Sequence, residues 1–432
     1  MQTKCYSALR ITDETVSLID LLEPANMDVE YRETCLPGTR LNILQDLFTS
    51  LIDPSLSHSV IWLRGLAGCG KSTILNTIAQ YFSKLRRCGA FLFWDRNDAV
   101  NSDPRRMIRT LAYQLAQSSL RFAEELASRL KAFPKKINSS LDEQFQYLLQ
   151  EPLATLAANH DLGPIVIALD ALDECGNPET RKQLLHTLSI RLEKLPAIFR
   201  VLIAGRDELD IRAALSHPGI VTRDVPIDDT SDISQFFQHF LSGSTPAFQA
   251  RGLSYDWPGD SVRQRLVIQS GGLFIWAATT IRFIESGIPE ERLEKVLDSS
   301  ACAQSHDRLD NLYRVALTHP FYSYHADELE TVHSILGAIV VAREQVTDEQ
   351  LSRLLDLKLS TVREVLSRLQ PLLQTGHGSL FKSYIPRSPI SCVTSTDVKM
   401  HNGTLTHLLI TTTSRLGVSD SCNEILSSTF VG

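Results

Sequence analysis

The sequence predicts an α/β fold, in which a parallel β-sheet flanked by helices is followed by smaller helical modules. From Val60 onward, short apolar segments without polar alternation are separated by longer amphipathic stretches, the pattern of a parallel sheet that is covered on both faces. Beyond about residue 228 the strand-like segments fade and helical periodicity dominates. The 432 residues suffice for several domains at about 150 residues each.

Composition and charge argue against several classes of protein. The 43 Lys and Arg residues are outnumbered by 50 Asp and Glu residues, which gives a net charge of −7, so no basic field favours nucleic acid as a partner. Nowhere do about 18 apolar residues follow one another, so no membrane association is expected. The eight cysteines are scattered, without metal-ligand or redox spacing, a usage that predicts reduced thiols and a cytoplasmic location.

The first 228 residues are expected to form an entry segment and the α/β core. Residues 1–58 are predicted to be a linker and an entry helix, because Pro37-Gly38 interrupts a polar stretch just before the amphipathic segment at 40–52. Residues 59–228 are predicted to be the core. Its candidate strands are VIWL at 60–63, GAFLFW at 89–94, IVIALDAL at 165–172 and RVLIAG at 200–205.

The second half is expected to hold two helical modules and a tail. An all-α helical lid is predicted at 229–325, and three further helical stretches predict a winged-helix-like module at 326–383. Thr347, which opens a T-D-E-Q capping box, and Ser360 are the candidate N-caps there. Residues 384–432 are rich in Ser, Thr and Pro and are predicted to be an irregular tail. An alternative is that this tail is aberrant and read out of frame.

A glycine-rich motif at 65–73 carries the strongest functional signal. It reads GLAGCGKST and fits G-x-x-x-x-G-K-S/T at a strand-to-helix junction, where the pattern predicts a phosphate-binding P-loop. Backbone N–H groups would wrap a phosphate at the positive end of the helix dipole, Lys71 would reach the β- and γ-phosphates, and Ser72 would ligate Mg²⁺. A glycine-rich turn without ligand is the alternative. The candidate phosphate-binding residues are Gly65, Gly68, Gly70, Lys71, Ser72 and Thr73.

Acidic side chains follow the third candidate strand. Asp170 comes at its carboxyl end, which is the edge where open α/β sheets bind ligands, so Asp170 is expected to hold Mg²⁺ together with Ser72. Asp173 and Glu174 lie on the next turn, where a carboxylate could orient or polarise an attacking water. Which of the two does so is left open. The alternative is that these acids only cap the following helix.

Arg206 follows the last candidate strand, at 200–205. This strand is expected beside the one that precedes the glycine-rich loop, so that Arg206 would face the terminal phosphate. A guanidinium fork suits phosphate oxygens and could distinguish a triphosphate from a diphosphate. The alternative is a surface arginine paired with Asp207 or Glu208.

Six segments together resemble the NACHT domains of the signal-transduction NTPases called STAND, most closely the large fungal set with nephrocystin-like N-terminal regions. They are CLPGTR at 35–40, WLRGLAGCGKSTI at 62–74, FLFWDRND at 91–98, IALDALDECG at 167–176, VLIAGRDE at 201–208 and GGLFIWAATTIRFI at 271–284. The resemblance runs in order through about residues 30–375. It departs at 204–207, where AGRD stands in place of a T-S-R-P-like tetrad: the arginine is kept, and the hydroxyls and the proline are not.

This resemblance implies a P-loop NTPase core that binds ATP or GTP with Mg²⁺, a helical lid and a winged helix, which act together as a slow nucleotide-controlled switch. The residues that it implies are Lys71 and Ser72 at phosphate and Mg²⁺, Asp170 at Mg²⁺, Asp173 and Glu174 in hydrolysis, and Arg206 as sensor. A homo-oligomer in the triphosphate state is a further implication of the family.

The expected function is a nucleoside-triphosphate-binding switch with slow Mg²⁺-dependent hydrolysis, with ATP favoured over GTP, acting in signalling or self/non-self recognition. Two other functions stay open. A P-loop phosphotransferase on a small metabolite would need an acceptor-binding lid with clustered arginines, whereas the D-x-x-D-E strand end favours water as the acceptor. A truncated, non-catalytic scaffold is the third possibility, since no effector domain is recognisable before residue 30 and no sensor repeats follow.

Overall fold

In the computed structural model the chain forms two compact units, residues 1–227 and residues 228–432. The structure describes residues 13–25, 32–53, 59–95, 98–157, 164–227, 230–243, 245–299, 312, 315–316, 321, 324–342, 346–369, 372–375 and 380–383. The tail predicted at 384–432 lies outside them. Among the described residues, no helix has both the length and the apolar composition that crossing a bilayer requires.

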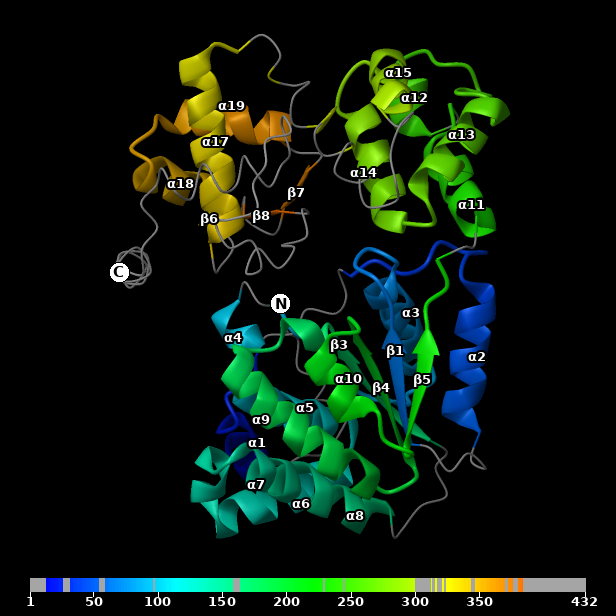
Figure 1. Cartoon of the computed structure of the whole chain (residues 1–432). Coiled ribbons are helices and arrows are strands. Elements are labelled where there is room, and N and C mark those ends of the chain that lie inside the picture. Colours follow the sequence, from blue (N-terminus) through cyan, green and yellow to red (C-terminus); the bar gives the residue numbers. More distant parts are fainter. Residues whose placement is uncertain are drawn as a thin grey trace. The chain divides into compact units, whose positions relative to one another are not determined.

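Five parallel strands form the sheet of unit 1 (Figure 1). They are β1 (Val60–Arg64), β2 (Cys88–Phe93), β3 (Ile165–Asp170), β4 (Phe199–Gly205) and β5 (Ile220–Asp224). Their order is β2-β3-β4-β1-β5 and every neighbouring pair is parallel. β4 therefore lies between β1 and β3, and Val60 of β1 faces Val201 of β4. The parallel α/β sheet predicted from the sequence is confirmed.

Helices cover both faces of this sheet, which explains why the central strands lack polar alternation. One face, with Ile61 and Leu63, packs on α2 (Leu41–Ile52) and α3 (Lys71–Lys84). The other face, with Trp62, packs on helices from the rest of the unit. These helices are α1 (Asp13–Asp20), α5 (Pro104–Ser118), α6 (Leu120–Ala132), α7 (Leu141–Phe145), α8 (Glu151–Ala157), α9 (Pro178–Arg191) and α10 (Leu209–Leu215).

Shorter elements complete unit 1. They are α4 (Ala99–Ser102), the single 3₁₀ turns η2 (Pro134–Asn138), η4 (Leu172–Glu174) and η5 (Leu192–Lys194), and η3 (Gln146–Gln150), a π-helical turn between α7 and α8. The residue before α5 is Asp103, whose carboxylate accepts a hydrogen bond from the Arg105 N–H at 3.0 Å. An N-cap of this kind satisfies a helix donor that would otherwise lack a partner.

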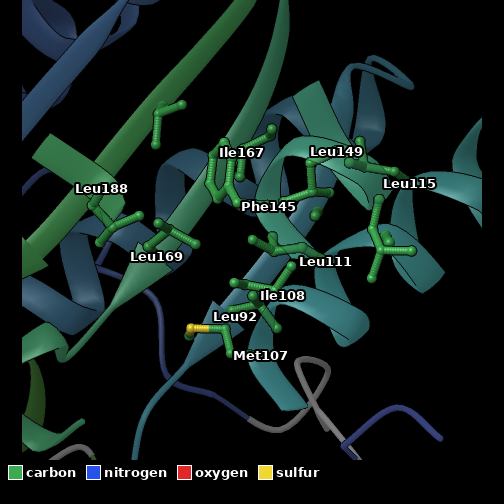
Figure 2. Close-up of a cluster of buried hydrophobic side chains, with 14 of the residues drawn as sticks. Leu92, Met107, Ile108, Leu111, Leu115, Phe145, Leu149, Ile167, Leu169 and Leu188 are labelled. Atoms are coloured by element: carbon green, nitrogen blue, oxygen red, sulfur yellow. The ribbon is translucent and has the colours of Figure 1, made fainter. Parts of the chain in front are cut away.

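Figure 2 shows the core between the sheet and α5. Its labelled side chains are Leu92, Met107, Ile108, Leu111, Leu115, Phe145, Leu149, Ile167, Leu169 and Leu188, none more than 5 % exposed. Burying a side chain of this size stabilises a fold by about 1.5–3 kcal/mol relative to exposure. Because Ile167 and Leu169 belong to β3, this packing also fixes the strand that ends in Asp170.

The described part of residues 1–58 packs onto the α/β unit. Ile19 and Leu22 are fully buried in the same core as α5 and α6. Farther along, the Cys35 N–H donates to Thr77 Oγ1 of α3 at 2.8 Å. The stretch that the sequence predicts to be a linker thus adds to the core, because its few apolar side chains find buried positions.

The edge strand β5 is not among the strands that the sequence predicts. Only Ile220 of its five residues is buried, so the segment lacks the continuous apolar run of a central strand. It pairs with β1 along its whole length, from Ile220 opposite Val60 to Asp224 opposite Arg64. A half-exposed edge strand carries little signal in a single sequence.

Unit 2 begins with a helical array, as the periodicity beyond residue 228 predicts. Its helices are α11 (Thr230–Phe240), α12 (Pro246–Gln249), α13 (Asp260–Ser270), α14 (Phe274–Glu285) and α15 (Pro289–Ser299). Phe237 of α11 and Trp276 of α14 are fully buried, and their rings meet edge to face with centroids 6.4 Å apart. Such aromatic pairs add stability beyond the area that they bury.

The rest of unit 2 combines helices with a small antiparallel sheet of order β6-β8-β7. The elements are α17 (Ala326–Val341), β6 (Val346–Thr347), α18 (Asp348–Leu354), α19 (Leu359–Leu369), β7 (Leu373–Thr375) and β8 (Leu380–Ser383). Thr347 caps α18 through the predicted capping box with Gln350. The predicted cap at Ser360 is wrong, because α19 already begins at Leu359 and the Lys358 carbonyl accepts from Val362 N–H at 3.1 Å.

Candidate functional site

The glycine-rich loop lies between the carboxyl end of β1 and the first turn of α3. Gly68 (φ 75°) and Gly70 (φ 95°) adopt left-handed backbone conformations that L side chains rarely take. At Gly65, a Cβ would lie only 2.8 Å from Cys69 Sγ, so the loop folds back closely on itself. At Gly70, by contrast, a Cβ would meet nothing within 4 Å. The space in front of the α3 N-terminus is therefore open.

Lys71, the first residue of α3, reaches back over this loop. Its Nζ donates to the carbonyl oxygens of Gly65 at 2.9 Å and Leu66 at 2.8 Å. The ammonium group is thereby held at the loop that precedes it, where a phosphate oxygen would be a stronger, charged acceptor. Thr73 is half-buried in the same helical turn, and its carbonyl oxygen accepts from Thr77 Oγ1 at 2.7 Å.

Ser72 and Asp170 meet across the carboxyl edge of the sheet. Ser72 Oγ donates to Asp170 Oδ1 at 3.0 Å, although 98 residues separate the two in the sequence. Asp170 is only 1 % exposed, whereas Ser72 is exposed. Burial raises the pKa of the Asp170 carboxyl, and the charge of Arg32, the Ser72 hydrogen bond and the charge of Lys71 oppose that rise. The structure thus brings the P-loop hydroxyl and the strand-end carboxylate together.

Arg32 is a member of the site that the sequence did not reveal. Its Nη1 lies 2.8 Å from Asp170 Oδ2, and its guanidinium carbon lies 3.6 Å from the centre of the Phe93 ring. The Asn76 side chain donates to the Arg32 carbonyl oxygen at 2.8 Å. Arg32 belongs to no helix, strand or motif, so no local pattern marks it.

Asp173 and Arg206 form a second pair at the same edge. Asp173 Oδ1 accepts from the Arg206 N–H at 3.0 Å, and Asp173 Oδ2 lies 3.0 Å from Arg206 Nε. Asp173 is 5 % exposed. Ala171 separates Asp170 from this pair and has a left-handed conformation with φ 59°. That turn sends the two carboxylates to different arginines.

Glu174 ends the turn η4 and is half-buried. Its backbone N–H donates to the Ala171 carbonyl oxygen at 2.8 Å. The following helix, α9, is capped by Asn177, whose side chain accepts from the Thr180 N–H at 2.9 Å. The acids of the D-x-x-D-E segment therefore do not provide the cap of that helix.

The alternative pairing of Arg206 with Asp207 or Glu208 is not what the structure shows. Asp207 Oδ2 pairs with Arg212 Nη2 at 2.7 Å, and Glu208 Oε2 pairs with Arg181 Nη2 at 2.8 Å. Both neighbouring carboxylates thus have arginine partners of their own. The strand that leads to Arg206 pairs with β1, as the sequence predicts.

Arg40 is a further residue whose role sequence reasoning missed. It is 5 % exposed, and its guanidinium donates to the Cys69 carbonyl oxygen at 2.9 Å and to the Pro226 carbonyl oxygen at 2.7 Å. The motif CLPGTR, which ends in Arg40, was a signal that this residue mattered, but its two partners lie 29 and 186 residues away.

The residues present fit a nucleotide phosphate with Mg²⁺. The open space at Gly70 lies before a helix N-terminus, which favours anions. Mg²⁺ prefers oxygen ligands and is usually held by one or two carboxylates together with substrate phosphates, and Ser72 and Asp170 supply oxygens of that kind. Within the part of the chain that the structure describes, no group of three or more His, Cys, Asp or Glu residues could hold a metal ion by itself.

Residues 38–206 match the model of the family described as nephrocystin 3, N-terminal. The match begins beside Arg40 and ends at Arg206, so it contains the glycine-rich loop, Asp170 and Asp173. The comparison with curated proteins gave no match.

Two solved structures that match this chain share little sequence with it. One is a signal-transduction ATPase with numerous domains (STAND) and a tetratricopeptide repeat sensor from Pyrococcus horikoshii, with 12 % identity and a TM-score of 0.44 over 83 % of this chain and 43 % of that one. Another is Cdc6p from Pyrobaculum aerophilum, with 14 % identity and a TM-score of 0.37 over 86 % and 93 % of the two chains. Residues 38–206 are thus similar to the nephrocystin 3 N-terminal family, and the parallel sheet and glycine-rich loop of unit 1 have the arrangement of a P-loop NTPase fold.

Proposed function

We propose that this protein is a nucleoside-triphosphate-dependent molecular switch of the STAND type, with slow Mg²⁺-dependent hydrolysis and a role in signalling or self/non-self recognition. The observation that carries the proposal is the 3.0 Å contact between Ser72 Oγ and Asp170 Oδ1 beside the glycine-rich loop. A phosphate chain lying along that loop would place a bridging cation where both side chains can hold it.

In this proposal each part of the loop has one task. The backbone N–H groups between Gly65 and Gly70 bind the phosphates, together with the dipole of α3. Lys71 exchanges the carbonyl oxygens of Gly65 and Leu66 for phosphate oxygens, which are charged and bind an ammonium more strongly. Ser72 and Asp170 hold Mg²⁺, which when bound neutralises charge on the phosphates.

Hydrolysis needs a carboxylate beside the attacking water, and we assign that task to Glu174. Both oxygens of the Asp173 carboxylate already contact Arg206, one through a hydrogen bond from its N–H and the other through an ion pair with Nε. Asp173 then acts as a positioning residue that aims Arg206. A terminal phosphate would draw the Arg206 fork away from Asp173, and this exchange would report whether a triphosphate is bound.

A switch requires that the ligand bind one arrangement of the chain better than another, since ligands shift a conformational equilibrium only through differential affinity. We infer that the helices α11–α15 form the lid and that α17–α19 with the β6-β8-β7 sheet form a winged-helix module that responds to the nucleotide. Homo-oligomers would form in the triphosphate state, and protein partners would read the change. ATP is the expected nucleotide, with GTP as the alternative.

The test is a titration of fluorescent mant-ATP and mant-GTP with and without Mg²⁺, together with a light-scattering measurement of size in each state. Lys71→Ala should weaken nucleotide binding by on the order of 100-fold or more, because it removes the charge that meets the β- and γ-phosphates. Lys84→Ala, at the other end of α3, is the matched control and should bind as the wild type does.

Unchanged nucleotide affinity in the Lys71 variant would contradict the assignment of the P-loop. A phosphate-release assay with and without small-molecule acceptors separates the switch from a phosphotransferase, because only a phosphotransferase would transfer label to an acceptor. A protein that binds neither nucleotide would be a scaffold.

A further inference from the structure

Arg32 contacts the Asp170 carboxylate, to which the proposed function assigns the binding of Mg²⁺. Its Nη1 is 2.8 Å from Asp170 Oδ2, while Ser72 Oγ donates to Oδ1 of the same carboxylate. The Asp170 side chain is 1 % exposed and the Arg32 side chain 29 % exposed. Both oxygens of a buried carboxylate are therefore engaged, one by the P-loop and the other by a cation from a segment 138 residues away.

A buried carboxylate is costly unless a cation or several donors satisfy it. Arg32 supplies Asp170 with a positive charge and an N–H donor at hydrogen-bonding distance. A hydrated Mg²⁺ would supply the same two things, a positive charge and the O–H donors of its water shell. The guanidinium and the hydrated metal therefore satisfy the same oxygen by the same chemistry, and one excludes the other.

The backbone around Arg32 is anchored independently of its guanidinium. Asn76 Nδ2 donates to the carbonyl oxygens of Arg32 at 2.8 Å and Glu33 at 3.0 Å, and the Cys35 N–H donates to Thr77 Oγ1 at 2.8 Å. Asn76 and Thr77 both belong to α3, the helix that follows the P-loop. The side chain can therefore leave Asp170 by rotation alone, while the segment stays in place.

Phe93 gives the guanidinium a second contact. The Arg32 guanidinium carbon lies 3.6 Å from the ring centroid, a cation–π contact that holds a charged group beside an aromatic face. Phe93 is the last residue of β2, next to β3 and opposite Asp170 in the sheet register. The Phe93 ring therefore stabilises the Arg32 guanidinium close to the Asp170 carboxylate.

We propose that Arg32 is a positioning residue that competes with Mg²⁺ for Asp170. The inference rests on the proposed function, because it assigns Asp170 to the metal. Arg32 neutralises and orients the carboxylate until a metal–nucleotide complex displaces it. Because Arg32 must be displaced first, a higher Mg²⁺ concentration is needed before the metal–nucleotide complex binds. Nucleotide without metal offers Asp170 no replacement cation and leaves Arg32 in place.

The experiment compares the Mg²⁺ dependence of mant-ATP binding in the wild type, Arg32→Ala and Arg32→Lys. In Arg32→Ala the half-saturating Mg²⁺ concentration should fall on the order of tenfold, the effect of losing one charge-assisted hydrogen bond that competes with the metal. Affinity for mant-ATP in EDTA should not change. Arg32→Lys keeps the charge without the planar fork and should lie between the two.

Arg223→Ala is the matched control. Arg223 lies in the edge strand β5 and pairs with Asp46 of α2 at 2.6 Å. Its partner is not Asp170, so its loss should leave the Mg²⁺ requirement at the wild-type value. Far-ultraviolet circular dichroism of each variant checks that it is folded, and Arg32→Lys provides a second variant if the alanine substitution prevents folding.

A measurement without nucleotide makes the inference testable by itself. Electron paramagnetic resonance of added Mn²⁺ should show tighter binding to Arg32→Ala than to the wild type, and Asp170→Asn in the same chain should abolish the gain. An unchanged Mg²⁺ requirement in Arg32→Ala would overturn the proposal. Weaker mant-ATP binding by Arg32→Ala in EDTA would also overturn it, because Arg32 would then contact the nucleotide itself. If no variant binds mant-ATP, the proposed function fails, and the Mn²⁺ comparison still decides the competition.

Discussion

Asp170 and Asp173 lie three residues apart and have different surroundings. Asp170 binds the Ser72 hydroxyl and the Arg32 guanidinium, whereas Asp173 binds Arg206. The left-handed turn at Ala171 separates them. One carboxylate therefore contacts the P-loop hydroxyl and the other contacts an arginine, and the proposed function assigns the polarisation of water to Glu174.

Glu174→Gln should lower the rate of hydrolysis by on the order of 100-fold, since general-base catalysis typically contributes that much or more. Its nucleotide affinity should stay that of the wild type, because the amide keeps the shape of the side chain. Steady-state phosphate release and mant-ATP titration measure the two quantities. Glu179→Gln, in the first turn of α9, is the control. A Glu174 variant with wild-type turnover would return the role to Asp173.

Single residues show clearly where sequence reasoning succeeds and where it stops. Lys71, Ser72 and Asp170 could be singled out because a short motif and a strand end mark them locally. Arg32 and Arg40 could not be given roles, because their partners lie far away in the sequence, at 138 residues for Arg32 and at 29 and 186 residues for Arg40. The position of Arg206 at a strand end could be predicted, but its partner Asp173 is a matter of side-chain geometry that only the fold determines.

Among helices and strands too, those marked by a local sequence pattern could be predicted and the others could not. The central strands of the sheet are buried on both faces, so their continuous apolar runs predict them. The edge strand β5 is buried at one residue only and escapes that pattern. At α18 the T-D-E-Q capping box is a local signal and predicts the cap, whereas α19 begins one residue before the serine that resembles a cap.

The link between α18 and α19 supplies a prediction about pH. Asp348, at the start of α18, accepts from Arg363 Nε at 2.6 Å, and that hydrogen bond lowers the pKa of the Asp348 carboxyl below 3.8. A lowered carboxyl pKa means that the stabilisation is present above the unfolded-state pKa and is lost as the pH falls through the folded-state pKa. The pair therefore stabilises unit 2 at neutral pH and fails below about pH 4.

Asp348→Asn should lower the free energy of unfolding at pH 7 by at most about 1 kcal/mol once solvent screening is allowed for. The difference from the wild type should shrink as the pH is lowered toward 3. Urea unfolding at several pH values measures it. Glu349→Gln is the control, because its carboxylate lies 3.9 Å from Arg353 in an exposed pair. A deficit that stays constant down to pH 3 would show that charge is not its cause.

At the scale of the whole molecule, the two units have separate hydrophobic cores. The sheet of unit 1 is packed on both faces by helices of the same unit. In unit 2, the helices α11–α15 and the helices α17–α19 have cores of their own. Units that each bury an apolar core can unfold as separate cooperative transitions.

Calorimetry should therefore resolve more than one unfolding transition. A bound nucleotide should raise the midpoint temperature of the transition that belongs to unit 1. At 100 times its Kd a ligand stabilises the state it binds by about 2.7 kcal/mol, roughly 5–10 °C for a unit of this size. Mg²⁺-ATP should have no such effect on the Lys71→Ala variant. A single transition, or an equal shift of all transitions, would contradict this division of the binding energy.

The contacts of Arg40 have a mechanical consequence. The Arg40 guanidinium donates hydrogen bonds to the Cys69 carbonyl oxygen inside the phosphate loop and to the Pro226 carbonyl oxygen, one residue before unit 1 ends at residue 227. A displacement of the loop by a bound phosphate would therefore reach the Pro226 carbonyl through one rigid guanidinium, with no other side chain between the two carbonyls.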